Sequence, residues 1–203
     1  MSEIKVVFFD VGGVLLTNGW DRKSRGLASE KFHLDWEDFQ DRHESVSSSF
    51  ETGKLTISEY LEGTVFYRQR DFTESEFVDF MKAQSIAMPE SLAVADELAN
   101  TGRYVLATLN NESRELNDYR IETFGLRNYF SVFLSSSYLG ISKPHREIYK
   151  LAVDITQRRP DQCLLIDDRK INLECANLAG IRPVHFKNAD QLRTSLRNLG
   201  VAI

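Results

Sequence analysis

The chain has 203 residues, 42% of them hydrophobic and 27% charged, and its 30 acidic and 25 basic residues give a formal net charge of -5. This composition is typical of a globular protein with a substantial core, and the absence of a basic block excludes nucleic acid as an expected partner. No apolar stretch has the length needed to cross a bilayer, and the N-terminal residues show no signal-peptide pattern, so we expect a cytoplasmic protein without a membrane partner.

The first strong signal is an apolar run over residues 4–9 that ends at Asp10 and is followed by Gly12 and Gly13. Unbroken runs of Val, Ile and Phe are typical of a strand that is buried on both faces of a parallel sheet. A carboxylate at the C-terminal end of such a strand lies where open α/β sheets bind ligands, and glycines let the backbone approach a bound group closely. Asp10 is therefore a candidate site residue, although a strand-end Asp often only satisfies turn amides.

A helical insertion is predicted over residues 18–88. Charged and aromatic residues recur there at helical spacing, and two capping-box sequences, Thr56 to Glu59 and Thr73 to Glu76, are typical helix starts. We therefore expect a core formed by residues 1–17 and 89–203, with this helical insertion between its two parts.

Further strands are expected at about 104–109, 131–135, 162–166 and 183–186, alternating with helical patterns. Alternation of this kind predicts parallel strands joined by right-handed helical crossovers. The expected fold class is α/β, with a doubly wound parallel sheet.

Three later segments also carry polar groups at strand ends or in loops. Asn110 and Asn111 follow the second strand, Lys143 lies in a loop before an amphipathic helix, and Asp167 and Asp168 end the strand at 162–166. In this order the chain resembles the haloacid dehalogenase-like hydrolase superfamily, whose motifs are a strand-end Asp, a strand-end Ser or Thr, a loop Lys and a strand-end acidic pair.

The details resemble one subgroup of that superfamily. Phe-Asp-x-Gly-Gly-Val-Leu, Leu-Asn-Asn-Glu-Ser-Arg-Glu-Leu-Asn and Ile-Asp-Asp-Arg-x-Ile-Asn look like sequences of the N-terminal phosphatase domain of soluble epoxide hydrolase and of bacterial glucose-1-phosphate phosphatases. The resemblance implies a Rossmann-like core, a cap domain that closes over the site, and Mg²⁺ as cofactor.

The resemblance also implies roles for individual residues. Asp10 would be the nucleophile that accepts the phosphoryl group, and Lys143 would supply positive charge to that group and hold Asp10 ionised. Asp10, the Gly12 carbonyl and Asp168 would bind Mg²⁺, with Asp167 and Asn172 acting directly or through water. Phosphate binding would fall to Asn110, Asn111 and Lys143. A helix cap remains an alternative for the acidic pair, and a solvated loop residue for Lys143.

Two positions depart from the superfamily pattern. Gly12 stands where most of its phosphatases carry an acid that protonates the leaving group, and Asn110 stands where Ser or Thr is usual. Loss of a general acid favours substrates whose leaving group needs little protonation, such as a sugar 1-phosphate or an acyl phosphate. Asp21 and Glu51, on the cap side, are acids that would be able to substitute.

The start of the predicted cap offers Asn18, Trp20 and Asp21 as candidate substrate contacts. For Trp20 the alternative is packing between cap and core, because large aromatic side chains are mostly buried.

The sequence therefore predicts a Mg²⁺-dependent phosphatase, a monomer or homodimer, that acts on a small phosphorylated metabolite. Two alternatives stay open: a 2-haloacid dehalogenase, whose chemistry needs no metal, and a non-catalytic phosphate-binding or regulatory protein, which the glycine at position 12 would allow.

Overall fold

A computed structural model describes residues 2–203, and its centre is a parallel sheet with the strand order β3-β2-β1-β4-β5. The strands are β1 (Val6–Phe9), β2 (Val105–Asn110), β3 (Val132–Ser135), β4 (Cys163–Asp167) and β5 (Arg182–His185). Each strand expected from the sequence is present, and the predicted doubly wound parallel sheet is confirmed.

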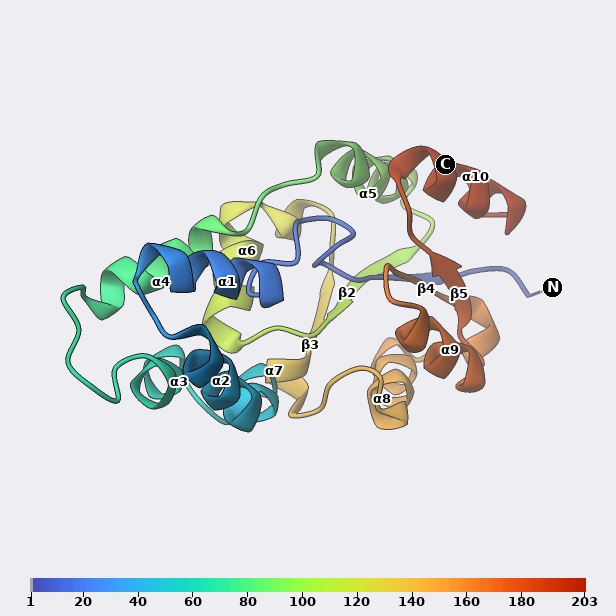
Figure 1. Cartoon of the computed structure of the whole chain (residues 1–203). Coiled ribbons are helices and arrows are strands. Elements are labelled where there is room, and N and C mark those ends of the chain that lie inside the picture. The colour runs from blue at the N-terminus through green and yellow to red at the C-terminus, as the bar shows by residue number, and fades with distance from the viewer. Residues whose placement is uncertain (1) are drawn as a thin grey trace.

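Helices cover both faces of the sheet (Figure 1). On one face, α5 (Pro89–Thr101) and α10 (Ala189–Asn198) pack in one hydrophobic cluster, together with Ile121 of α6 (Arg114–Thr123). On the other face, α8 (Arg146–Thr156) and α9 (Lys170–Leu178) pack in a second cluster. Alternate side chains of β1 enter the two clusters, which explains why this strand is apolar throughout.

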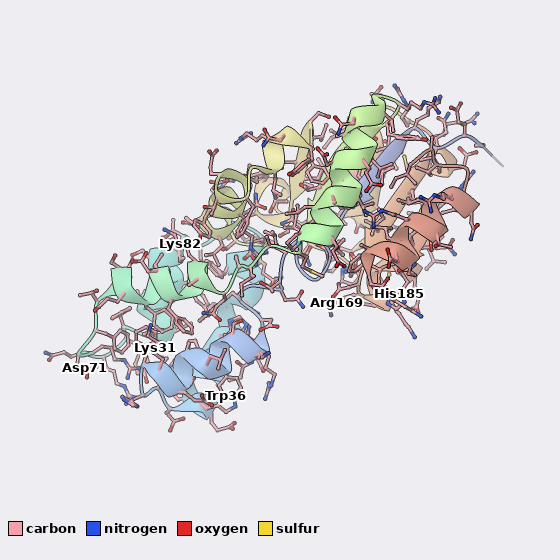
Figure 2. The ribbon with its side chains drawn as sticks, turned by 90° about the horizontal axis from the view of Figure 1, so that it is seen from above. Lys31, Trp36, Asp71, Lys82, Arg169 and His185 are labelled. Atoms are coloured by element: carbon pink, nitrogen blue, oxygen red, sulfur yellow. The ribbon has the colours of Figure 1, made fainter. Side chains whose placement is uncertain are left out.

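Four helices lie between β1 and α5 and form a separate lobe (Figure 1). They are α1 (Arg22–Lys31), α2 (Trp36–Glu51), α3 (Ile57–Thr64) and α4 (Glu74–Ala83). Both predicted capping boxes are present, at the starts of α3 and α4. The view from above shows Lys31, Trp36, Asp71 and Lys82 on this lobe, and Arg169 and His185 on the sheet-containing lobe (Figure 2). We propose that residues 18–88 form a cap domain on a core of residues 1–17 and 89–203.

An aromatic cluster holds the four-helix lobe together. Trp20, Phe32, Phe39 and Phe77 are buried, and their rings meet mostly edge-on or tilted at centroid distances of 4.8–6.4 Å. Such pairs add to the stabilisation that comes from apolar burial, so the lobe has a hydrophobic centre of its own.

The core also contains three short helical segments, and one of them contacts the four-helix lobe. They are η1 (Leu126–Asn128), α7 (Ser136–Leu139) and η2 (Pro160–Gln162). At α7 the hydroxyl of Ser136 donates to the backbone carbonyl of Glu51, at 2.6 Å, and a Cβ on Gly53 would lie 2.3 Å from the carbonyl oxygen of Ser137. The end of α2 therefore contacts the core backbone directly, and this contact places Glu51 beside the carboxyl ends of the strands.

Within residues 2–203, none of the helices combines the length and the apolar character that a membrane span requires.

Candidate active site

The parallel register brings the strand-end acids together. Phe9 of β1 pairs with Thr108 of β2 and with Ile166 of β4. The residues that follow Phe9 and Ile166 are Asp10 and Asp167, so these two acids lie side by side. The Asp10 amide also donates to the Ile166 carbonyl at 2.9 Å, which continues the pairing of the two strands by one residue. Two acids that are 157 positions apart in the sequence thus become neighbours at one edge of the sheet.

Lys143 is the charged centre of the site. Its Nζ lies 2.6 Å from Oδ2 of Asp167 and 3.0 Å from Oδ2 of Asp10, and its side chain is 1% exposed. Burial lowers the pKa of Lys143, but the charges of Asp10 and Asp167 more than compensate, and the net shift is upward. The ammonium is therefore a permanent cation, and the interpretation of Lys143 as a solvated loop residue is wrong for this structure.

Asp167 is fully buried and its oxygens already have protein partners. Oδ1 accepts from the Arg169 amide at 2.8 Å, and both oxygens accept from Nδ2 of Asn172, at 3.0 and 3.1 Å. Asp167 is absent from the residues that line the cavity described below. Its contacts are those of a group that positions Lys143 and Asn172.

Asp168 completes an acidic cluster at the surface of this arrangement. Oxygen atoms of Asp10, Asp167 and Asp168 all lie within 4.8 Å of one another. Desolvation, followed by repulsion from Asp167, raises the pKa of Asp168. Desolvation also raises the pKa of Asp10 to about 7, against the opposing effect of Lys143. A nearby cation would stabilise the ionised form of both carboxyls.

Gly13 permits this approach of Asp168 to the first strand. It has a φ of +74°, and a Cβ at this position would lie 2.3 Å from Oδ2 of Asp168. A side chain would displace the carboxylate, so glycine is required by both the backbone conformation and the close contact.

The cluster fits a hard divalent cation. Three carboxylates against the single ammonium of Lys143 leave an excess of two negative charges when all four groups are ionised. Oδ1 of Asn172 is buried and has no hydrogen-bond partner among residues 2–203, so it is an acceptor without a donor beside the acids. Carboxylate and amide oxygens are the ligands that Mg²⁺ takes in proteins. The site thus has the charge and the donor atoms that the sequence predicted, and the individual ligand assignments remain predictions.

A cavity of about 650 Å³ lies between the core and the four-helix lobe, a size that accommodates a small ligand. Both lobes contribute to its walls. The core residues are Asp10, Gly12, Asn111, Glu112, Arg120, Lys143, Asp168, Arg169 and Asn172, and those of the segment 18–88 are Asn18, Trp20, Asp21, Arg22, Arg25, His43, Ser47 and Glu51. In Figure 2, Arg169 lies on the side of the core that faces the lobe.

Asn111 fixes the loop that carries Lys143. Its Nδ2 donates to the Lys143 carbonyl at 2.8 Å, and its Oδ1 accepts from the Lys143 amide at 2.9 Å. Asn110 was predicted to bind phosphate with its side chain, but the structure places that side chain away from the cavity lining. It is 1% exposed, and Nδ2 donates to Oδ1 of Asn117 at 3.0 Å, because the last residue of β2 points into the layer beneath α6.

The space beside Gly12 is occupied by other residues. A Cβ on Gly12 would lie 3.3 Å from Oδ1 of Asn18 and 3.8 Å from Nη1 of Arg120. Arg120 is 2% exposed and is held by Glu112 at 3.0 Å and by Ser85 at 3.0 Å. A side chain at position 12 would therefore begin close to Asn18 and within van der Waals contact of this guanidinium, on the wall of the cavity.

The structure separates the roles of the two cap-side acids. Oδ1 of Asp21 accepts from the Ser24 amide at 2.8 Å and caps α1. Glu51 also lines the cavity, and desolvation, followed by repulsion from Glu112, raises its pKa.

Trp20 both packs and lines the cavity. Its indole N–H donates to the hydroxyl of Tyr60 at 3.0 Å, and its ring joins the aromatic cluster inside the four-helix lobe, while Trp20 also lines the cavity. His43 is buried in the same wall and lies 2.9 Å from the Tyr60 hydroxyl. Burial lowers the pKa of His43 to about 4, which leaves the ring neutral at physiological pH.

Sequence reasoning missed several residues of the cavity wall. Arg25 and His43 resemble ordinary polar residues of amphipathic helices. Arg120 lies in α6, and Glu112 lies just before the start of that helix. Nothing local distinguishes them from solvated charges. A weak signal was present only for Arg120, which lies in the same predicted helix as the buried positions Leu116 and Ile121.

Comparisons with known proteins agree with this geometry. Flavin mononucleotide hydrolase 1 of Arabidopsis thaliana is 30% identical over 168 residues, which cover 80% of this chain and 65% of that protein. Bifunctional epoxide hydrolase 2 of Sus scrofa is 22% identical over 97% of this chain and 38% of its own length. The chain thus spans between about two fifths and two thirds of the length of these two relatives.

Among solved structures, a haloacid dehalogenase family enzyme of Bacteroides thetaiotaomicron, in complex with magnesium and inorganic phosphate, superimposes with a TM-score of 0.76 at 22% identity. The match covers 91% of this chain and 95% of that one. The family model described as haloacid dehalogenase-like hydrolase matches residues 4–180. With the predicted sheet and strand-end acids in place, this match establishes that the chain belongs to the haloacid dehalogenase-like hydrolase family.

Proposed function

We propose that the protein is a Mg²⁺-dependent phosphatase that transfers a phosphoryl group from a small phosphorylated metabolite to Asp10 and then to water. The observation that carries the proposal is the pairing of Asp10 with a buried ammonium, Lys143, inside an acidic cluster that faces a cavity. Relatives that include a flavin mononucleotide hydrolase, and a fold neighbour that binds magnesium and phosphate, support it.

Each residue of the site would have its own role in phosphoryl transfer. The Asp10 carboxylate attacks phosphorus and forms a P–O bond while the bond to the leaving oxygen breaks, and water later cleaves the aspartyl phosphate. Lys143 holds Asp10 in its ionised form and offsets charge on the transferring group. Asp10, Asp168 and the Gly12 carbonyl would hold Mg²⁺, with Asn172 and Asp167 behind them. When bound, the cation neutralises the repulsion between the carboxylate and the phosphate.

The acidic cluster also weighs against the two alternatives. Displacement of halide from a carbon atom needs no divalent cation, so a 2-haloacid dehalogenase would have no use for Asp168 beside Asp10. A non-catalytic phosphate-binding protein would not need a nucleophile that is held ionised by a buried lysine. Phosphatase chemistry uses all of these groups.

We expect the wild-type protein to release inorganic phosphate from members of a panel of phosphorylated metabolites in the presence of Mg²⁺. Asp10→Asn should lower kcat by at least about 1,000-fold, because removal of a nucleophile leaves only the binding contributions. Colorimetric phosphate release measures both. The matched control is Asp71→Asn, which changes an exposed Asp on the far side of the four-helix lobe (Figure 2). Equal rates for Asp10→Asn and the wild type, or full activity with a chelator, would contradict the proposal.

Mg²⁺ should stabilise the protein more at pH 8 than at pH 5.5. The pKa of Asp10 is raised from 3.8 to about 7 in the metal-free fold. Between those values the folded state keeps a proton that the unfolded chain releases, so metal-free stability falls as the pH rises through this window. A cation binds the carboxylate form and reverses that loss, and a concentration 100 times the Kd adds about 2.7 kcal/mol.

Differential scanning fluorimetry with and without Mg²⁺ measures this effect. Asp168→Asn should abolish the Mg²⁺-dependent increase in Tm, whereas Asp71→Asn should keep it. An increase that is equal at both pH values would show that protons and the cation do not compete at this site.

We infer that the preferred leaving group needs little protonation, because position 12, on the wall of the cavity, carries glycine and no acid. Glucose 1-phosphate should therefore have a kcat/KM at least about 10-fold above that of glucose 6-phosphate, since a general acid contributes about 100-fold to 10,000-fold where it is needed. Steady-state kinetics with both sugars measure the ratio. A preference for glucose 6-phosphate would reject this specificity.

Glu51 is the carboxyl that we propose as the remaining proton donor and acceptor. Glu51→Gln should lower kcat for glucose 6-phosphate by about 100-fold, and should affect glucose 1-phosphate less, because its leaving group is the weaker base. It should also remove the alkaline limb of the pH–rate profile that the Glu51 carboxyl would produce. Glu62→Gln, on the exposed surface of α3, is the control. An unchanged pH profile in Glu51→Gln would exclude the role.

A further inference from the structure

Arg25 is a buried cation in the cap wall of the cavity. It lies in the first turns of α1, its residue is 7% exposed, and its side chain lines the cavity opposite the acidic cluster. The roles proposed above for phosphoryl transfer do not use it.

The guanidinium is held in a fixed orientation. Its Nε donates to Oε1 of Gln40 at 3.0 Å, and Nη1 donates to the backbone carbonyl of Trp20 at 2.9 Å. Nη2 has no hydrogen-bond partner within the described part of the chain. Two neutral acceptors therefore orient the group and leave one nitrogen for a ligand.

No carboxylate of residues 2–203 forms an ion pair with Arg25. Two acids lie in the same wall. Asp21 caps α1, and Glu51 lies beyond ion-pair distance from Arg25. Burial lowers the pKa of Arg25, yet guanidinium groups stay protonated in proteins, so the charge remains. Asp21 and Glu51 attract this charge without forming an ion pair with it. A buried charge that lacks a close partner is costly, and a ligand would complete the pair.

Other cations of the cavity differ from Arg25 in this respect. Lys143 pairs with Asp10 and Asp167, and Arg120 pairs with Glu112. Arg22 is exposed and lies 5.0 Å from the centre of the Trp36 ring. Arg169 is also exposed. Arg25 is buried and forms no ion pair within residues 2–203, which is the combination expected of a group that binds an anion.

We propose that Arg25 binds an acidic group, a carboxylate or a second phosphate, on the leaving-group half of the substrate. The proposal rests on the phosphatase function above. The phosphoryl group would lie against Asp10 and Lys143 on the core, and the acidic group would face the cap wall. A guanidinium fork matches the oxygens of carboxylate and phosphate, so the substrate class would be phosphomonoesters that carry a second anionic group.

Matched substrates test this specificity. Glucose 1-phosphate, glucuronic acid 1-phosphate and glucose 1,6-bisphosphate share the anomeric phosphate and differ only at the sixth carbon, and phosphoethanolamine and O-phosphoserine differ by a carboxylate. For at least one series, we expect the wild-type kcat/KM for an acidic member to exceed that of the neutral member by about 10-fold or more, as expected for hydrogen bonds to a charged group. The carboxylate and bisphosphate arms show which acid is preferred.

Arg25→Gln should reduce this acidic-to-neutral ratio by about 10-fold, mainly through KM for the acidic member. Arg42→Gln is the matched control, because Arg42 lies on α2 in an exposed pair with Asp38 and outside the cavity. The control should keep the wild-type ratio. Circular dichroism and thermal melting show whether Arg25→Gln folds, and the wild-type ratio tests the proposal independently of that variant.

The outcomes distinguish failure of the Arg25 role from failure of the phosphatase function. Hydrolysis of both members of every series at similar kcat/KM overturns the role of Arg25 and leaves the phosphatase function standing. A wild-type preference that Arg25→Gln retains also overturns it, because the selectivity then comes from another group. If neither these compounds nor any member of the wider panel is hydrolysed with Mg²⁺ present, both proposals are overturned.

Discussion

The site depends on one buried ammonium between two carboxylates. Lys143 is removed from water at a large desolvation cost, which its contacts with Asp10 and Asp167 offset. Removal of either acid would leave a buried charge incompletely paired, so the cluster acts as a unit. The register of β1 and β4 places the acids, and Asn111 fixes the loop that carries the lysine. The geometry of Asp10 therefore follows directly from strand pairing.

Glycines make the close approaches of this site possible. At Gly13, the backbone comes so near to Asp168 that a side chain would displace the carboxylate. At Gly19, a Cβ would lie 1.5 Å from Nη2 of Arg120, so the guanidinium packs directly on the backbone. The same guanidinium lies near Gly12, where a Cβ would be 3.8 Å from its Nη1. The position where an acid is usual in the superfamily thus lies close to a buried ion pair between Arg120 and Glu112.

The cap contributes rigidity to the opposite wall. Tyr60 stacks on Phe50 with ring centres 4.1 Å apart, accepts a hydrogen bond from Trp20 and contacts Nδ1 of His43. Because Trp20 is fixed by this network, its carbonyl is a defined acceptor for Arg25. An aromatic core of modest size thus orients polar groups toward the cavity, while the chemistry stays on the sheet.

The sequence by itself determined the parallel sheet, the helical insertion, and the strand-end residues Asp10, Asp167 and Asp168 together with Lys143. These signals are local, because apolar runs, capping boxes and polar strand ends can be recognised within short windows. The topology of a parallel sheet then requires the strand ends to meet. Only the tertiary structure decided that Asn110 turns away from the cavity, that the ion pair of Arg120 and Glu112 lies near Gly12, and that Arg25 is buried without an ion pair among the described residues. The reason is physical: burial and pairing of a helical side chain depend on residues that approach from elsewhere in the chain, and the periodicity of its own helix does not encode them.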